Sequence, residues 1–426
     1  MRVIDENGSS ETGRIDKDQP KECSFCRRQI DLTRVLVKGP ESAICDICVE
    51  NASHVVKLAM AQNRTTLKDN IPTPHEIFDE LSAYVIGQDE AKKRIAVAVY
   101  NHYKRVTSKV LGDDVEIEKS NILMIGPTGT GKTLLAQTLA RYLKVPFAIA
   151  DATTLTEAGY VGEDVENVLV RLFHSANGDV SQAEIGIVYI DEIDKVARKD
   201  SSTSITRDVS GEGVQQALLK ILEGAEANIP PEGGRKHPEQ KLVKINTKNI
   251  LFICGGAFDG IDAITQNRLG KAGMGFGAPV RSKQKMGYHE ILKKVEPDDL
   301  RKFGLIPELI GRLPVITPLD RLSREALMSI LTEPRNALVK QYGKLIELEG
   351  VELSLKKGAL SAIVDKAIEL DTGARALRNV IETVMNDIMF DLPELKDVKK
   401  VVINENVVLN KEKPTFIKHK PKRKSA

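Results

Sequence analysis

Tryptophan is absent from this 426-residue sequence, and aromatic residues make up only 4% of it. Binding of nucleic acid by stacking of bases on aromatic side chains is therefore a poor first expectation. Basic and acidic residues nearly balance, 62 to 60, so composition indicates no general surface for polyanions. No apolar run approaches the roughly 20 residues that span a membrane. The first twenty residues contain five acids and no apolar core, which argues against a signal or transit peptide and predicts a cytoplasmic location.

The clearest motif is the segment 126–133, called the phosphate loop below. It follows an apolar run at 122–125 and fits the G-x-x-x-x-G-K-[ST] pattern. Its residues are Gly126, Pro127, Thr128, Gly129, Thr130, Gly131, Lys132 and Thr133. In such loops, backbone N–H groups and the N-terminus of the next helix surround a phosphate chain. We expect this loop to bind ATP, with Lys132 reaching the β- and γ-phosphates and the Thr133 hydroxyl ligating Mg²⁺.

An acidic pair, Asp191 and Glu192, ends another apolar run about 60 residues later. A carboxylate at the end of a buried strand can hold Mg²⁺ through its water shell, and the next carboxylate can orient the attacking water. Asp191 and Glu192 take these roles in our interpretation. Adjacent acids are common on surfaces, so the pair alone is a weak signal. Together with the phosphate loop, it predicts hydrolysis of the nucleotide.

Short apolar runs alternate with helical patterns between residues 75 and 318. The runs occupy 122–125, 147–150, 185–190, 250–253 and 313–316. This alternation predicts an α/β fold in which helices cover both faces of a mainly parallel sheet. Ligands of such a sheet gather at its carboxyl edge. Farther on, the helical periodicity of 324–342, 357–369 and 374–390 predicts a small α-rich domain, called the lid, over residues 319–410.

Four of the five cysteines form two C-x-x-C pairs, with 18 residues between the pairs. These are Cys23, Cys26, Cys45 and Cys48. Their spacing is typical of a Zn²⁺ site, and four thiolates would leave no position for water, so we expect a structural metal. Two disulfides fit a cytoplasmic chain poorly. The residues between the pairs mix charged and apolar types, which suits protein contacts or self-association at least as well as nucleic acid.

The sequence predicts six successive parts. They are a disordered lead at 1–20, a zinc-binding module at 21–62, a linker at 63–74, a large ATPase domain at 75–318, the lid at 319–410 and a basic tail at 411–426, also expected to be disordered. The linker is marked by polar residues followed by Pro72 and Pro74.

One further segment has no role in these motifs. Tyr160 and Val161 stand between Gly159 and Gly162. Exposed on a mobile loop, they would be a poor use of apolar surface unless they gripped a ligand. From the residues alone, that interpretation and a core tyrosine at a turn are equally supported.

The phosphate loop, the acidic pair, the Gly-Tyr-Val-Gly segment and the four cysteines together resemble the ClpX family of AAA+ protein unfoldases. The resemblance covers roughly residues 20 to 410. It implies a homohexameric ring that uses ATP hydrolysis to pull tagged or unfolded proteins through a central pore and pass them to the ClpP peptidase. Adaptor proteins would dock on the zinc module. Tyr160 and Val161 would be the pore residues that grip the substrate.

The resemblance also implies further nucleotide contacts. Val85 and Ile86 would line the adenine pocket. Arg312 resembles the arginine finger that reaches the γ-phosphate bound to a neighbouring subunit, and Arg375 resembles the sensor-2 arginine of the small domain. Fixed charge and planar donors suit arginine to both tasks. Without the resemblance, each arginine would be interpreted as a surface ion-pair residue.

The position of sensor 1 departs from the AAA+ pattern. The run 250–253 ends in Cys254-Gly255-Gly256, without the polar residue common elsewhere, so no sensor-1 residue is assigned. Cys254, the odd thiol, is expected to be buried.

Other segments match loops that would bind substrate or partner in this family. Arg235, Lys236 and His237 match a basic loop at the pore entrance, which would attract acidic or carboxylate-bearing substrate ends. The alternative is a solvated run of charge. Residues 198–206 lie where a second pore loop belongs. The tripeptide that would dock on ClpP is represented by Met274, Gly275 and Phe276, with Met in place of the usual Ile or Leu, so the affinity for ClpP stays open.

The leading hypothesis is therefore an ATP-driven protein unfoldase. The alternative is an AAA+ motor or loader that acts on nucleic acid and holds it with the zinc ribbon. Such a motor should line its pore with Lys or Arg, so the balanced charge and the Gly-Tyr-Val-Gly segment stand against it. Within the unfoldases, HslU is disfavoured by the N-terminal zinc module and the lack of a long inserted domain.

Overall fold

The computed structural model divides the chain into two compact units, residues 1–70 and 71–426. It describes residues 2–4, 10–11, 22–29, 35–38, 42–63, 71–107, 117–156, 163–197, 211–231, 242–271, 287–395, 397–410 and 412–419. Across these ranges, no helix combines the length and apolar character needed to cross a membrane. The predicted domain boundaries stay predictions.

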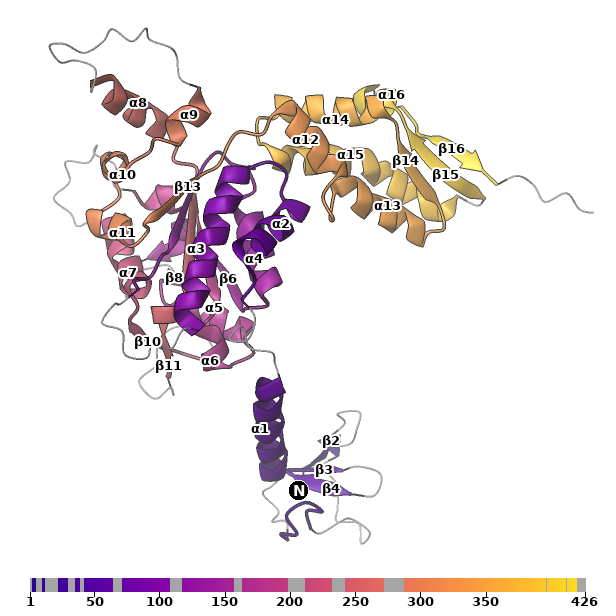
Figure 1. The fold of residues 1–426 in the computed structure, drawn as a ribbon. Helices are drawn as coiled ribbons and strands as arrows, with labels where there is room; N and C mark the ends of the chain where they lie inside the picture. Colours follow the sequence, from indigo (N-terminus) through magenta and orange to yellow (C-terminus); the bar gives the residue numbers. More distant parts are fainter. Residues whose placement is uncertain are drawn as a thin grey trace, which may run out of the picture. The chain divides into compact units, whose positions relative to one another are not determined.

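The described residues of the first unit form a four-stranded sheet of order β2-β1-β3-β4 and one helix (Figure 1). β3 (Val35–Lys38) pairs antiparallel with β4 (Ala43–Cys45), and α1 (Asp46–Asn63) follows directly. Two short strands, β1 (Arg2–Ile4) and β2 (Ser10–Glu11), lie in the lead predicted to be disordered. That prediction is wrong for these residues, because β1 pairs in parallel with β3 and so satisfies its backbone hydrogen bonds.

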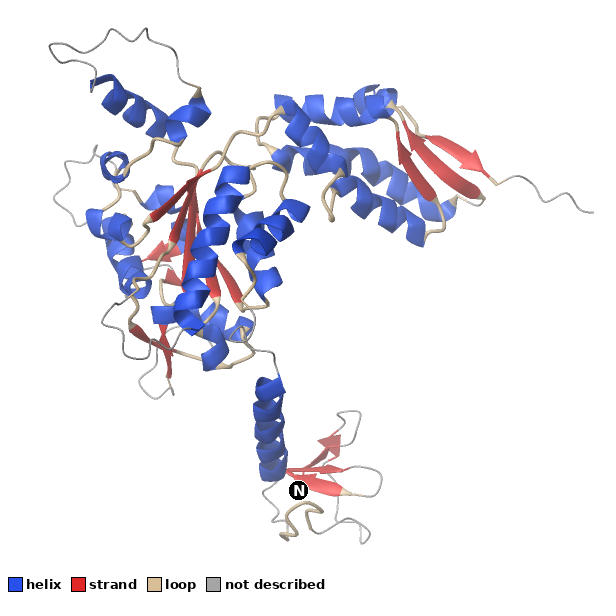
Figure 2. Cartoon of the chain, in the orientation of Figure 1, coloured by secondary structure: helices blue, strands red, loops and turns tan. Residues whose placement is uncertain are grey.

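The second unit is built on a five-stranded sheet of order β13-β5-β12-β9-β6 (Figure 2). The strands are β5 (Ile122–Ile125), β6 (Phe147–Asp151), β9 (Ile187–Asp191), β12 (Leu251–Gly256) and β13 (Val315–Pro318). All four neighbouring pairs are parallel, which confirms the predicted sheet. Each strand lies within a few residues of its apolar run, and β9 ends at Asp191 as predicted.

Helices cover both faces of this sheet, so every residue of the inner strand β5, which lies between β13 and β12, is buried. On one face, Leu123 and Ile125 belong to a core that includes α5 (Asn167–Ser175) and α7 (Glu212–Glu223). The helices α2 (Pro74–Tyr84), α3 (Asp89–Thr107) and α4 (Lys132–Leu143) pack together, with α4 against β9 and β12 and α3 against β13. The sheet thus presents the carboxyl ends of its strands beside the start of α4.

Smaller elements complete the large domain. They are η1 (Ala152–Thr154), β7 (Leu155–Thr156), β8 (Glu163–Asp164), α6 (Val180–Ala183), η2 (Ile193–Val196), β10 (Glu226–Ile229), β11 (Val243–Asn246), η3 (Thr247–Asn249), α8 (Ile261–Lys271), α9 (Tyr288–Leu292), α10 (Pro297–Phe303) and α11 (Pro307–Gly311).

The lid packs helices against a three-stranded sheet of order β14-β15-β16. Its elements are α12 (Arg324–Thr332), α13 (Leu338–Leu348), β14 (Glu352–Leu355), α14 (Lys357–Glu369), α15 (Ala374–Asp391), η4 (Leu392–Glu394), β15 (Val398–Ile403) and α16 (Glu405–Asn410). The single helical segment predicted over 324–342 is two helices, because Pro334 has no N–H to continue the first one.

The basic tail contains the third strand of the lid sheet. The prediction of a disordered tail is wrong for β16 (Thr415–Lys418), which pairs antiparallel with β15. Phe416 packs against the buried core of the lid, and this contact offsets the cost of ordering a charged segment. The basic composition of the tail hides this short apolar stretch.

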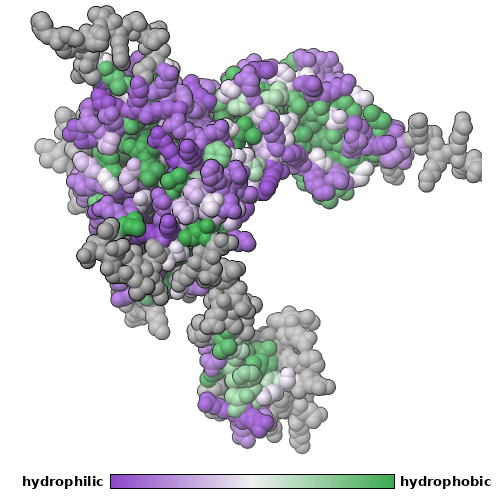
Figure 3. All heavy atoms as spheres, viewed as in Figure 1, coloured by the Kyte–Doolittle hydropathy of each residue, from purple (hydrophilic) through white to green (hydrophobic). Residues whose placement is uncertain are grey.

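Large apolar side chains also lie on the surface of the lid. Leu348 and Phe390 are 74% and 81% exposed. Figure 3 shows apolar residues among polar ones on the visible face of this domain. Exposed apolar side chains of this size are available for contacts with another protein chain.

Candidate functional site

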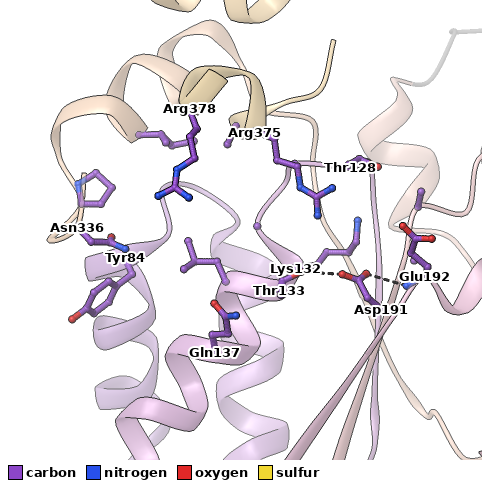
Figure 4. A pocket seen from close by; sticks show the side chains of 18 of the residues that line it. Tyr84, Thr128, Lys132, Thr133, Gln137, Asp191, Glu192, Asn336, Arg375 and Arg378 are labelled. Carbon is purple, nitrogen blue, oxygen red and sulfur yellow. Dashed lines mark hydrogen bonds between the residues drawn. The ribbon is translucent and has the colours of Figure 1, made fainter. Parts of the chain in front are cut away.

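A cavity of about 510 Å³ lies between the phosphate loop, the ends of β9 and β12, and the lid (Figure 4). Its lining includes eight of the residues predicted to bind or hydrolyse the nucleotide: Thr128, Gly129, Gly131, Lys132, Thr133, Asp191, Glu192 and Arg375. The lid adds apolar and amide side chains, which are Ile330, Asn336, Ala337, Leu338 and Gln341. Two segments separated by about two hundred residues in the chain therefore form one site.

The phosphate loop is shaped by glycine and stiffened by hydrogen bonds. Gly129 and Gly131 have φ of 79° and 99°, in the left-handed region that glycine enters without strain. Lys132, the first residue of α4, is buried and its Nζ donates to the carbonyls of Gly126 and Pro127 at 2.6 and 3.0 Å. Burial lowers the pKa of the Lys132 ammonium, while the nearby Asp191 acts in the opposite direction.

The carboxylate of Asp191 meets the first turn of α4. Thr133 Oγ1 donates to Asp191 Oδ2 at 3.1 Å, and the backbone N–H of Glu192 donates to Asp191 Oδ1 at 3.0 Å. The Thr133 proton is thereby directed to Asp191, which leaves the lone pairs of the hydroxyl oxygen for a cation. A hydroxyl and a carboxylate are the oxygen ligands that Mg²⁺ prefers, so these residues fit the predicted metal.

Glu192 leaves the strand in an unusual backbone conformation. Its φ of 56° places a non-glycine residue in the left-handed region, directly between β9 and η2. Such conformations cost energy and persist only where the surrounding structure imposes them. Here the sharp turn ends β9 at the cavity, where the exposed carboxylate of Glu192 lies in the lining.

The phosphate loop and the lid touch through their backbones. The N–H of Ala374, at the start of α15, donates to the carbonyl of Gly129 at 3.2 Å. A Cβ on Gly129 would lie 2.3 Å from the Thr372 carbonyl oxygen, and one on Gly373 would lie 2.9 Å from the Thr128 carbonyl oxygen. Only glycine on both sides permits this approach. Arg375 follows the contact immediately, so its position depends on the loop.

The segment that joins the large domain to the lid is also tied to the site. Leu319 donates its N–H to the Ile125 carbonyl at 2.7 Å, and a Cβ on Gly126 would lie 2.6 Å from the Leu319 carbonyl oxygen. The Gln88 side chain pairs with the backbone of Asp320, donating to its carbonyl at 2.9 Å and accepting from its N–H at 2.8 Å. The junction between the large domain and the lid is thus held to the end of β5 and to Gln88.

Six of the predicted nucleotide residues lie outside the cavity lining: Gly126, Pro127 and Thr130 of the phosphate loop, and Val85, Ile86 and Arg312. Val85 is buried behind the phosphate loop, and its Cγ1 is 3.7 Å from where a Cβ of Gly131 would be. Ile86 is half-buried beside it, and Tyr84 is the residue of this segment in the lining. Arg312 is half-exposed, with Nη2 3.1 Å from Glu223 Oε1 of the same chain. A residue that acts on a neighbouring subunit is expected to lie away from its own cavity.

The substrate and partner loops lie outside the described residues. This applies to Tyr160 and Val161, to Arg235, Lys236 and His237, and to Met274, Gly275 and Phe276. Their roles stay predictions.

The lining also includes residues that no motif indicates. Arg378 lies one turn after Arg375 in α15 and points into the same cavity (Figure 4). Its spacing of three from Arg375 is the signal that could have revealed it. The guanidinium groups of Arg141 and Arg335 both lie near the Tyr84 ring, 5.7 and 5.8 Å from its centroid. No sequence pattern predicts that arrangement.

The second candidate site is the cluster of four cysteines in the first unit. Their sulfur atoms all lie within 4.8 Å of one another, and Cys26 Sγ is 3.9 Å from Cys45 Sγ. In a tetrahedral site with Zn–S bonds of about 2.3 Å, sulfur atoms lie about 3.8 Å apart. Burial raises the pKa of Cys48 to about 12, whereas the N–H groups of Cys26, Cys45 and Phe25 outweigh burial and lower the pKa of Cys23 to about 6. A divalent cation would let all four thiolates ionise together.

Removing zinc should unfold the first unit and leave ATP hydrolysis largely intact. Among the described residues of that unit, the hydrophobic cluster consists of the four cysteines with Ala43 and Ile44, so the metal is expected to supply most of its stability. Cys45→Ser should reduce bound zinc to well below one equivalent and lower the helical signal in circular dichroism. Cys254→Ala is the matched control, because Cys254 is a buried thiol of the other unit. Unchanged metal content in Cys45→Ser, or an equal loss of ATPase, would contradict the assignment.

Comparisons with known proteins agree with this geometry. Residues 21–57 match the family model of the ClpX C4-type zinc finger, residues 117–316 match that of the AAA domain (Cdc48 subfamily), and residues 322–404 match that of the C-terminal, D2-small domain of ClpB protein. A curated relative from Treponema denticola, named ATP-dependent Clp protease ATP-binding subunit ClpX, is 53% identical over 397 residues. The match covers 93% of this chain and 96% of the relative.

Proposed function

This chain belongs to the ClpX family of AAA+ ATPases, and we propose that it is an unfoldase that converts ATP hydrolysis into pulling on protein substrates. The observation that supports this best is the cavity shared between the phosphate loop and the lid, with backbone contact at Gly129 and Gly373. A lid in contact with the loop cannot keep its position when the loop rearranges around a nucleotide. Hydrolysis can therefore move one domain against the other.

The residues of the cavity divide the chemistry among them. Backbone N–H groups of the phosphate loop and Lys132 would hold the phosphates, after the Lys132 ammonium leaves the carbonyls of Gly126 and Pro127. Thr133 and Asp191 would hold Mg²⁺, which when bound neutralises charge on the β- and γ-phosphates. Glu192 would orient and polarise the attacking water. Arg375, on the lid, would contact the γ-phosphate. When the γ-phosphate leaves after hydrolysis, this contact would be lost and the lid would be released.

The proposed assembly is a homohexamer, as the family implies, in which Arg312 of one subunit would complete the site of the next. Exposed apolar side chains on the lid suit such contacts between copies. We further propose that Met274-Gly275-Phe276 docks on the ClpP peptidase, that the basic residues 235–237 attract substrate ends, and that adaptors or a second copy bind the zinc module. The proposed location is the cytoplasm.

Whether the chain acts on protein or on nucleic acid can be tested by measuring which of the two stimulates its ATPase activity. Unfolded protein should raise the rate of ATP hydrolysis, and double- or single-stranded DNA should not. Stimulation by DNA alone would favour the nucleic-acid motor and would contradict the proposal.

Tyr160→Ala should preserve ATP hydrolysis but impair unfolding of the substrate protein. Removal of the ring takes away the gripping surface and leaves the cavity residues untouched, so ATPase should stay within about twofold while unfolding of a stable tagged protein falls at least tenfold. Tyr160→Phe is the matched control, because it keeps the apolar ring and should retain unfolding. Equal unfolding by Tyr160→Ala and the wild type would show that Tyr160 does not grip the substrate.

A further inference from the structure

The carboxyl end of β12 lacks a polar side chain where it meets the cavity, and a neighbouring strand supplies one. Strand β12 ends in Cys254, Gly255 and Gly256. In the register between β12 and β9, Ile253 is opposite Tyr189. Because side chains alternate along a strand, Gly255 lies two residues further on the same face as the Tyr189 ring. The ring extends over Gly255 toward the carboxyl edge of the sheet.

The Tyr189 ring occupies the space where a side chain at position 255 would lie. A Cβ at position 255 would lie 2.3 Å from Tyr189 Oη, closer than real Cβ contacts, and 3.0 Å from Tyr189 Cζ. The backbone does not itself demand glycine, because Gly255 is not among the positive-φ residues. The side chain of Tyr189 is therefore the reason that position 255 has none.

The Tyr189 hydroxyl is aimed at the acidic end of its own strand. Tyr189 is fully buried, and its Oη donates to Asp191 Oδ1 at 3.1 Å. The phenolic O–H is a hydrogen-bond donor at neutral pH. With the Glu192 N–H and the Thr133 hydroxyl, this makes three donors to a carboxylate that has about four acceptor sites. Asp191 is held in one orientation, with one acceptor site left for the cavity.

We propose that Tyr189 is a positioning residue that fixes the Asp191 carboxylate for Mg²⁺, and that Gly255 is required to admit it. This pair takes the place of the polar residue absent from the end of β12. The inference rests on the proposed metal role of Asp191. Hydrogen-bond partners of metal ligands typically change metal affinity by about 10- to 100-fold when they are removed.

The test measures the Mg²⁺ dependence of nucleotide binding in the full chain. A fluorescent ATP analogue is titrated at increasing Mg²⁺, and the rise in melting temperature given by ATP with Mg²⁺ over ATP with EDTA is recorded in parallel. Tyr189→Phe should raise the Mg²⁺ concentration for half-maximal binding about tenfold and leave binding in EDTA unchanged. Tyr103→Phe is the matched control, because Tyr103 is an equally buried tyrosine whose hydroxyl donates to the Ile185 carbonyl at 3.1 Å.

A double-mutant cycle tests the pairing with Gly255. Gly255→Ala should raise the Mg²⁺ concentration for half-maximal binding and lower the melting temperature, because the new Cβ displaces the Tyr189 hydroxyl. Adding Tyr189→Phe should restore part of that stability, since the worst contact is with the hydroxyl oxygen. Additive losses in the double variant would overturn the pairing, and an equal Mg²⁺ shift in Tyr103→Phe would overturn the positioning role.

Asp191→Asn distinguishes the positioning role of Tyr189 from the metal-binding role of Asp191. If Asp191→Asn shifts the Mg²⁺ dependence and Tyr189→Phe does not, the inference about Tyr189 is wrong and the metal role of Asp191 stands. If Asp191→Asn produces no shift, the metal role itself is wrong.

Discussion

Glu192→Gln should lower the rate of ATP hydrolysis at least a hundredfold while ATP affinity stays within about twofold of the wild type. The amide keeps the size of the carboxylate but cannot polarise the attacking water by accepting its proton. The structure places Glu192 in the cavity lining beside Asp191, yet no phosphate-loop residue hydrogen-bonds to its side chain in the part of the chain that the structure describes. Binding should therefore survive the change.

The measurement is single-turnover hydrolysis with nucleotide binding followed separately. Glu184→Gln is the matched control, because Glu184 accepts a hydrogen bond from the Asn246 N–H at 2.8 Å outside the cavity lining. It loses the same charge from the same domain and should keep near-normal hydrolysis. Near-normal turnover by Glu192→Gln would remove Glu192 from the catalytic role.

Arg312→Ala should reduce hydrolysis by about a thousandfold, the effect expected when an arginine finger is lost. The variant should still bind ATP, because Arg312 does not line the cavity of its own chain. Mixing it with Glu192→Gln subunits should restore measurable hydrolysis. In the mixed assembly, some sites combine an intact Glu192 from one variant with an intact Arg312 from the other.

The ion pair between Arg312 and Glu223 of the same chain provides the control. Glu223→Gln removes the partner 3.1 Å away, and a pair this exposed contributes about 0 to 1 kcal/mol to stability. Hydrolysis by Glu223→Gln should stay within a few-fold of the wild type. If Glu223→Gln is as damaging as Arg312→Ala, or if mixing restores nothing, Arg312 acts within its own subunit and the finger assignment is wrong.

Local patterns in the sequence predict the sheet and much of the site. The apolar runs mark all five strands, because buried parallel strands are apolar on both faces. The spacing of the glycines with Lys132, and of the paired cysteines, reflects constraints within a few residues. Glu192 likewise follows directly from the end of β9.

Contacts between distant segments could not be predicted in this way. The glycines at 129 and 373 are explained only when the lid is placed against the phosphate loop. Tyr189 and Gly255 require the register of two strands that are 60 residues apart in sequence. The strand in the basic tail depends on a free edge at β15, which no pattern in the tail itself indicates.

The central claim is that ATP hydrolysis at this cavity unfolds protein. The most direct measurement follows a folded fluorescent reporter with an unstructured C-terminal tag, incubated with the chain and ATP, with ClpP added or omitted. Fluorescence should fall irreversibly only when the chain, ATP and ClpP are all present, and Glu192→Gln should abolish the loss. Steady fluorescence while the wild-type chain hydrolyses ATP beside active ClpP would contradict the claim.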